Sequence, residues 1–168
     1  LTVTPYVPDS YEPDSVPADA KTISDGQTQN RSIHAVGDAD WAKFTLTLTS
    51  NVVIETNGVA DDTELWLYGP DDPSILIAYN DDIVPSLFSR ISVRNLAPGT
   101  YYIKVGEHHN NDTIETYTLS LAVSPYFPDA YEPDNVPEDA KVISNGEIQN
   151  RSIHFLGDVD WAKFTVTQ

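Results

Sequence analysis

The feature that most constrains this chain is an internal repeat. Residues 5–47 and 125–167 align without gaps at an offset of 120, and 31 of the 43 aligned positions are identical. One repeat period therefore fills residues 1–124, whereas residues 125–168 contain only the opening third of the next. We expect a complete domain over 1–124 and the N-terminal part of a second copy over 125–168. A repeat of this kind makes neighbouring copies of the same protein the first expected partners.

The complete copy has the pattern of an all-β domain. Residues 41–48 alternate between apolar and polar side chains, which is typical of a half-buried strand. One short helix is expected at residues 16–21, with Ser15 as its N-cap. Six further strand-like segments are separated by clusters of Gly, Pro, Asn and Asp, at residues 52–56, 64–68, 75–80, 90–95, 100–107 and 116–123. This number and spacing of strands predicts an antiparallel β-sandwich.

Composition excludes several classes of partner. The formal net charge of −17 repels nucleic acid and anionic lipid surfaces. No apolar run approaches the roughly 20 residues that a membrane-spanning helix needs, so membrane insertion is not expected. The chain has no Cys and no Met, so disulfides cannot stabilise it, and we expect a mature fragment or an excised piece. An acidic, clearly patterned chain of this kind points to solubility and to cation binding.

Five pieces of the sequence carry a family resemblance, residues 9–14, 37–41, 62–68, 97–105 and 117–119. Taken in this order, they resemble the bacterial and archaeal pre-peptidase C-terminal domains, jelly-roll-like β-sandwiches that follow secreted proteases and other exported proteins. The resemblance implies an accessory, non-catalytic role. The related collagen-binding domains of clostridial collagenases bind calcium through an acidic N-terminal segment and an acidic loop, and the matching positions here are Glu12, Asp14, Asp38 and Asp40.

The residues themselves also favour a hard cation at these positions. Pro13 restricts both itself and Glu12, so the Glu12 and Asp14 carboxylates are held in a narrow range of relative positions. Asp38 and Asp40 are also two residues apart and lie on one side of an extended segment. An all-oxygen ligand set favours Ca²⁺ over zinc. The second copy repeats the set as Glu132, Asp134, Asp158 and Asp160.

Other interpretations of these residues stay open. The acidic residues beside turns can simply be solvated, with Asp14 or Ser15 capping the short helix. A second metal site is a further hypothesis, because two acidic doublets lie at strand ends, Asp61-Asp62 and Asp81-Asp82. Trp41 and Trp66 fall out of step with the apolar faces of their strands, so each is either an exposed ring for ligand stacking or packed under a loop.

No catalytic motif is found, so we expect a protein that is not an enzyme. The predicted function is a calcium-stabilised accessory module of a secreted or cell-surface protein, with a structural or targeting role. The alternative is an extracellular module that binds polysaccharide or protein in an adhesive array. A partial sandwich cannot cover its own apolar face, so self-association through 125–168, by strand exchange or end to end, is also expected.

Overall fold

The computed structural model describes residues 8–59 and 61–166. The chain divides into two compact units, Leu1–Ser124 and Pro125–Gln168, and each is described by itself below. Within the described ranges, no helix has both the length and the apolar character needed to cross a membrane.

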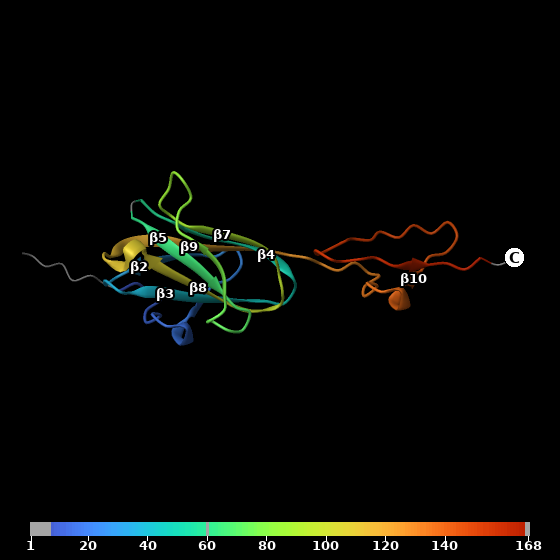
Figure 1. Cartoon of the computed structure of the whole chain (residues 1–168), viewed down its shortest axis with the longest axis horizontal. Coiled ribbons are helices and arrows are strands. Elements are labelled where there is room, and N and C mark those ends of the chain that lie inside the picture. The colour runs from blue at the N-terminus through green and yellow to red at the C-terminus, as the bar shows by residue number, and fades with distance from the viewer. Residues whose placement is uncertain (1–7, 60, 167–168) are drawn as a thin grey trace, which may run out of the picture. The chain divides into compact units, whose positions relative to one another are not determined.

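The first unit is a sandwich of two sheets (Figure 1). The five-stranded sheet has the order β1 (Lys21–Thr22), β3 (Ala39–Leu46), β8 (Gly99–Glu107), β5 (Thr63–Tyr68) and β6 (Leu76–Asn80). The four-stranded sheet has the order β2 (Thr28–Ile33), β9 (Ile114–Pro125), β4 (Ser50–Asn57) and β7 (Arg90–Leu96). Strand β1 runs parallel to β3, whereas the pairs β3–β8, β8–β5 and β5–β6 are antiparallel. Two short 3₁₀ turns, η1 (Pro17–Asp19) and η2 (His108–Asn110), complete the unit. The predicted all-β sandwich is confirmed.

Alternating side chains from both sheets form the core. On β3, Ala42, Phe44 and Leu46 point inward and are buried, as their spacing predicts. The ring of Phe44 stacks on Tyr101 of the neighbouring strand β8, with centroids 5.4 Å apart. All seven strand-like segments found in the sequence are strands, with ends that differ by at most two residues.

Strand β2 was not predicted, and the reason is physical. Its inward-facing side chains include Gln29 and Arg31, which are buried polar residues rather than apolar ones. The segment therefore lacks the apolar alternation that marks a half-buried strand. The helix expected at residues 16–21 is a single 3₁₀ turn. Ser15 does not cap it, because the Ser15 hydroxyl donates to Asp38 Oδ1 at 3.1 Å.

The second unit repeats the local features of the first without its sandwich. It contains a 3₁₀ turn, η3 (Pro137–Asp139), and a parallel pair of two-residue strands, β10 (Lys141–Val142) and β11 (Ala162–Lys163). Residues 125–166 include no counterpart of residues 49–124. As a result, Phe164 is 72% exposed, whereas the equivalent Phe44 is 3% exposed.

Candidate metal centre

The acidic positions singled out in the sequence gather where strands of the two sheets meet the N-terminal segment. β2 belongs to one sheet and β3 to the other, and the turn that joins them carries Asp38. The N-terminal segment is attached to β3 by a hydrogen bond from the Trp41 N–H to the Asp14 carbonyl oxygen, at 3.0 Å. Ligands on these three segments would therefore join both sheets and the N-terminal segment at one point.

Glu12, Asp14 and Asp40 form the most buried group. Each offers one carboxylate oxygen, and these oxygens lie within 4.8 Å of one another. Asp14 and Asp40 are each 1% exposed. Among the described residues, Asp14 Oδ1 and Asp40 Oδ1 are shielded from solvent and have no hydrogen-bond partner, whereas the shielded Glu12 Oε1 lies 2.9 Å from His34 Nδ1. Two buried, unpartnered oxygens beside a third carboxylate are a costly arrangement unless a cation lies among them.

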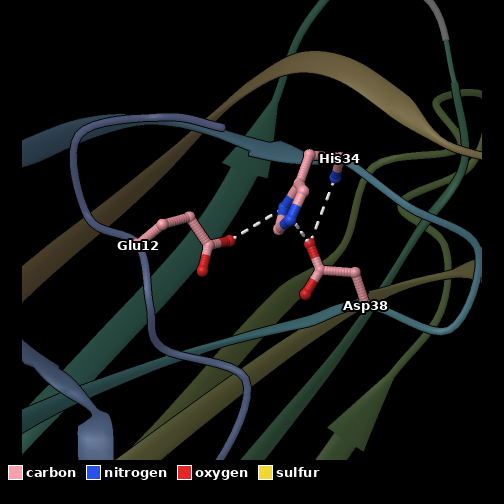
Figure 2. Close-up of side chains that lie close together, drawn as sticks. All are labelled: Glu12, His34 and Asp38. Atoms are coloured by element: carbon pink, nitrogen blue, oxygen red, sulfur yellow. Dashed lines mark hydrogen bonds and ion pairs between the residues drawn. The ribbon is translucent and has the colours of Figure 1, made fainter. Parts of the chain in front are cut away.

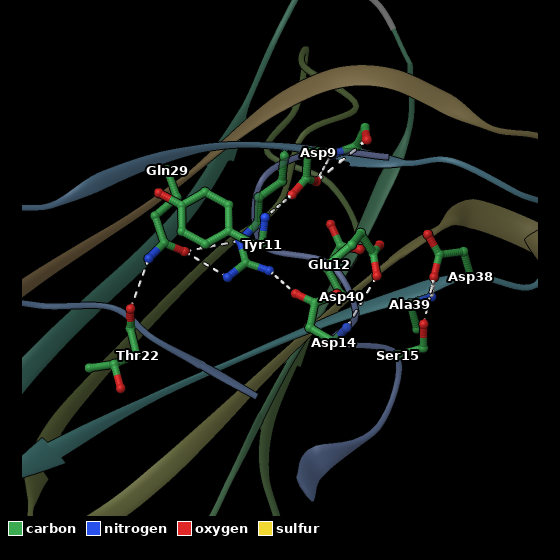
Figure 3. Close-up of polar contacts among 12 residues, drawn as sticks. Asp9, Tyr11, Glu12, Asp14, Ser15, Thr22, Gln29, Asp38, Ala39 and Asp40 are labelled. Atoms are coloured by element: carbon green, nitrogen blue, oxygen red, sulfur yellow. Dashed lines mark hydrogen bonds and ion pairs between the residues drawn. The ribbon is translucent and has the colours of Figure 1, made fainter. Parts of the chain in front are cut away.

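The other oxygens of these carboxylates are held by hydrogen bonds or ion pairs to the protein, as Figure 3 shows for Glu12 and Asp14. Glu12 Oε2 accepts the Asp14 N–H at 3.1 Å, and Asp14 Oδ2 pairs with the guanidinium of Arg31. Asp40 Oδ2 accepts a hydrogen bond from the Tyr117 hydroxyl on β9, at 2.6 Å. In each carboxylate, one oxygen is therefore held by the protein, and the other makes no hydrogen bond within the described residues.

A buried polar chain supports Arg31 in turn. Gln29 Oε1 accepts from Arg31 Nε at 3.0 Å and from Nη2 at 2.7 Å, and the Gln29 amide donates to the Thr22 carbonyl at 2.9 Å. The Arg31 guanidinium also lies 4.6 Å from the centre of the Tyr11 ring. Gln29 and Arg31, the polar residues because of which β2 was not predicted, are therefore also the residues that hold Asp14 in place.

The electrostatics of the group leave negative charge uncompensated. Burial raises the pKa of Asp14 to about 7, although Arg31 opposes the shift, and the Glu12 carboxylate adds to it. Burial also raises the pKa of Asp40 to about 8, opposed by the hydrogen bond from Tyr117 and increased by Asp14. The Arg31 guanidinium is the one positive charge that opposes these pKa shifts, and it faces three carboxylates, those of Glu12, Asp14 and Asp40. The group therefore either takes up protons or binds a cation.

Asp38 belongs to a second group that shares Glu12 (Figure 2). His34 Nδ1 lies 2.6 Å from Asp38 Oδ2 and 2.9 Å from Glu12 Oε1. Asp38 Oδ2 also accepts the His34 N–H at 3.1 Å. The four predicted ligands are therefore arranged as two overlapping groups, and Asp38 is not grouped with Asp14 and Asp40. His34 is not among the ligands predicted from the sequence, although its identical place before each Gly-Asp turn is a usable signal.

The second copy keeps part of this arrangement. Glu132, His154 and Asp158 form a group like that of Glu12, His34 and Asp38. Asp160, however, is grouped with Glu132 and Asp129 rather than with Asp134, which pairs with Arg151. The second copy has no counterpart of Tyr117 to hold the aspartate on the strand.

The remaining predicted residues fall into two sets. Asp62 and Asp81 come together with His108, whereas Asp61 and Asp82 are not part of that group. Trp41 is 8% exposed and lies 5.4 Å from the Tyr68 ring, so packing accounts for its position. Trp66 is half-buried, with Lys104 Nζ 4.5 Å from its ring centre.

Comparison with known proteins finds one family model that matches part of the first unit. Residues 38–107 match the model of the bacterial pre-peptidase C-terminal domain, which confirms the resemblance drawn from the sequence pieces. The matched range includes Asp38 and Asp40 and begins after Glu12 and Asp14.

Among solved structures, the pre-peptidase C-terminal domain of collagenase from Bacillus anthracis aligns with a TM-score of 0.50 and 24% identity, covering 61% of this chain and 93% of that one. The periplasmic inhibitor of g-type lysozyme, PliG, from Aeromonas hydrophila aligns with a TM-score of 0.49 and 12% identity, covering 62% of this chain and 96% of that one. At this identity the collagenase domain supports the fold alone. The search of curated proteins gave no match.

Proposed function

We propose that this chain, which carries a bacterial pre-peptidase C-terminal domain at residues 38–107, is a non-catalytic accessory module of a secreted or cell-surface protein, and that calcium stabilises it. The observation that carries the proposal is the convergence of the Glu12, Asp14 and Asp40 carboxylates, in which Asp14 Oδ1 and Asp40 Oδ1 are shielded and have no hydrogen-bond partner among the described residues. Calcium prefers carboxylate oxygens and tolerates irregular geometry. It would supply the positive charge that Arg31 alone does not.

Bound calcium would act on stability through the position of the site. Glu12 and Asp14 come from the N-terminal segment, Asp40 lies on β3, and Tyr117 on β9 fixes Asp40 from the other sheet. A cation among these carboxylates therefore links segments far apart in sequence. Extracellular calcium is abundant enough to fill a site of modest affinity, which accords with a role outside the cell.

The alternative function, binding of polysaccharide or protein, has weaker support. The aromatic residues expected to stack on such a ligand are largely covered, since Trp41 is 8% exposed and Lys104 lies over Trp66. Tyr79, at 46% exposed, is the open ring beside Trp66, and the two rings are inclined by 43° rather than coplanar. This surface is less suited to stacking on a flat sugar face than a coplanar pair.

Calcium is expected to raise the melting temperature of the chain by about 10 °C relative to the protein in chelator. Free calcium at about 100 times the dissociation constant adds about 2.7 kcal/mol to the free energy of unfolding, and each kcal/mol moves the midpoint by about 4 °C in a domain of this size. Magnesium should give a smaller shift, because it demands octahedral geometry and loses its water reluctantly. Thermal unfolding followed by circular dichroism measures both shifts.

Two matched variants locate the effect. Asp40→Asn should lose most of the calcium shift while melting no lower than the wild type in chelator, because the amide oxygen can still accept from the Tyr117 hydroxyl and the buried side chain then carries no charge. Asp160→Asn, the same change in the second copy, should keep the full shift. Identical melting curves of the wild type in calcium and in chelator would refute the proposal.

A further inference from the structure

A second cluster of metal-ligating side chains lies at one end of the five-stranded sheet. Asp62 directly precedes β5, Asp81 directly follows β6, and His108 directly follows β8. These strands are neighbours in the order β8, β5, β6, and Thr63 pairs with Glu107 while Leu65 pairs with Asn80. Antiparallel pairing thus brings the three residues to the same end of the sheet.

The ligand atoms of the cluster converge. One atom each from Asp62, Asp81 and His108 lies within 4.8 Å of the others. His108 Nδ1 is 3.1 Å from Asp81 Oδ1 and 3.4 Å from Glu64 Oε1. Glu64 is held in turn by the Tyr79 hydroxyl, which donates to the same oxygen at 2.7 Å. The cluster therefore presents one imidazole nitrogen and three carboxylates.

A separate observation points to a ligand at this place. Asp62 Oδ1 is shielded from solvent and, among the described residues, has no hydrogen-bond partner, although the Asp62 side chain is only partly buried. Asp81 Oδ1 and His108 Nδ1 are shielded as well, and their contacts are those within the cluster. Side chains that point their polar atoms at one another and away from solvent are arranged as ligands of a metal ion are.

The backbone that carries these side chains is fixed. The His108 N–H donates to the Asp62 carbonyl at 3.1 Å, which joins the start of β5 to the end of β8. Buried Ser89 lies with its hydroxyl 2.5 Å from the Asp81 carbonyl oxygen and also contacts the Thr63 carbonyl oxygen. The ligands are therefore preorganised, which lowers the entropy cost of binding a metal.

We propose that Asp62, Asp81 and His108, with Glu64 beside them, form a second metal site that binds a first-row divalent transition ion such as Zn²⁺. The imidazole nitrogen distinguishes this site from the all-carboxylate group of Glu12, Asp14 and Asp40. Nitrogen and carboxylate ligands together suit zinc, whereas calcium takes oxygen. The site does not depend on the proposed calcium function, and it has no counterpart in residues 125–166.

The test is a zinc titration of the full chain in saturating calcium, followed by calorimetry or equilibrium dialysis. The matched variants are His108→Asn and His109→Asn. His109 adjoins His108 but lies outside the cluster, and its backbone φ of 67° is one that asparagine tolerates. The wild type and His109→Asn should bind one more zinc ion per chain than His108→Asn, or bind it about a hundredfold more tightly.

Asp81→Asn is the second variant, chosen because it changes charge and not shape. It should weaken zinc binding by at least about tenfold while the melting temperature in calcium stays within a few degrees of the wild type. If zinc binds the wild type and both cluster variants with the same stoichiometry and affinity, the ion is held elsewhere and the proposal is wrong. Absence of zinc binding by the wild type would overturn it equally.

Discussion

Replacing Arg31 with alanine is expected to lower the free energy of unfolding by about 3–5 kcal/mol, measured by urea denaturation in chelator. The Arg31 side chain is fully buried and is the cation paired with Asp14, so its removal leaves a buried carboxylate without a counter-charge. The loss should be smaller in calcium, because a cation among Glu12, Asp14 and Asp40 would replace part of the missing charge. A smaller loss in calcium than in chelator would therefore support the proposed calcium site.

The repeat supplies the control for this experiment. Arg151 makes the same contacts with Asp134 and Gln149, but its side chain is 15% exposed and no sandwich closes over it. Arg151→Ala should therefore change the main unfolding transition by less than about 0.5 kcal/mol. Equal effects of the two substitutions would mean that burial by the second sheet does not determine the contribution of this ion pair.

Replacing Phe44 with alanine is expected to cost about 3–5 kcal/mol, because a large buried ring is removed from a closed core. Phe44 is 3% exposed and stacks on Tyr101. Phe164→Ala is the matched control, since Phe164 occupies the equivalent position and is 72% exposed. It should change the free energy of unfolding by less than about 0.5 kcal/mol. Urea denaturation of both variants under identical conditions measures the difference.

The same pair tests the expected self-association. If another copy covered Phe164 in solution, Phe164→Ala would lower both the stability and the molecular mass found by light scattering. Strand exchange alone cannot cover every apolar face, because each chain has two copies of residues 5–47 and one of residues 49–124. An exchanged assembly would always leave one copy unpaired per chain. An end-to-end contact avoids that deficit.

The sequence allowed the sandwich to be predicted because most strands follow the apolar alternation that burial requires. β3 is the clearest case, with Ala42, Phe44 and Leu46 inward. β2 was missed since its buried positions hold Gln29 and Arg31. A pattern method reads such residues as exposed, so a strand with polar inward side chains needs the structure to be recognised.

The gathering of the acidic residues could be predicted in part, for a similar reason. Glu12 with Asp14, and Asp38 with Asp40, are pairs two residues apart, and each pair recurs 120 residues later. Tyr117, which holds Asp40, lies 77 residues away in sequence and leaves no local signal. The grouping of Asp62 and Asp81 with His108 likewise depends on which strands are neighbours. Local spacing predicts ligand pairs, whereas the fold decides how the pairs combine.

In the proposed calcium site, the buried carboxylates around Glu12 would exchange protons for calcium. The pKa values of about 7 at Asp14 and about 8 at Asp40 lie above the ordinary carboxyl value. The metal-free fold therefore gains stability as the pH falls from about 8 towards 5, and calcium would have to displace protons in that range. Calcium affinity should accordingly fall with decreasing pH, in the opposite direction to the stability of the metal-free chain.

Calorimetric calcium titration of the chelator-treated chain at pH 8 and pH 6, in buffers of different ionisation enthalpy, measures this exchange directly. Calcium binding should release protons and should be at least about tenfold tighter at pH 8 than at pH 6. Asp40→Asn should abolish most of the binding and its proton release. The proposed exchange of protons for calcium is contradicted if no calcium binds at pH 8, or if binding is equally tight at both pH values and releases no protons.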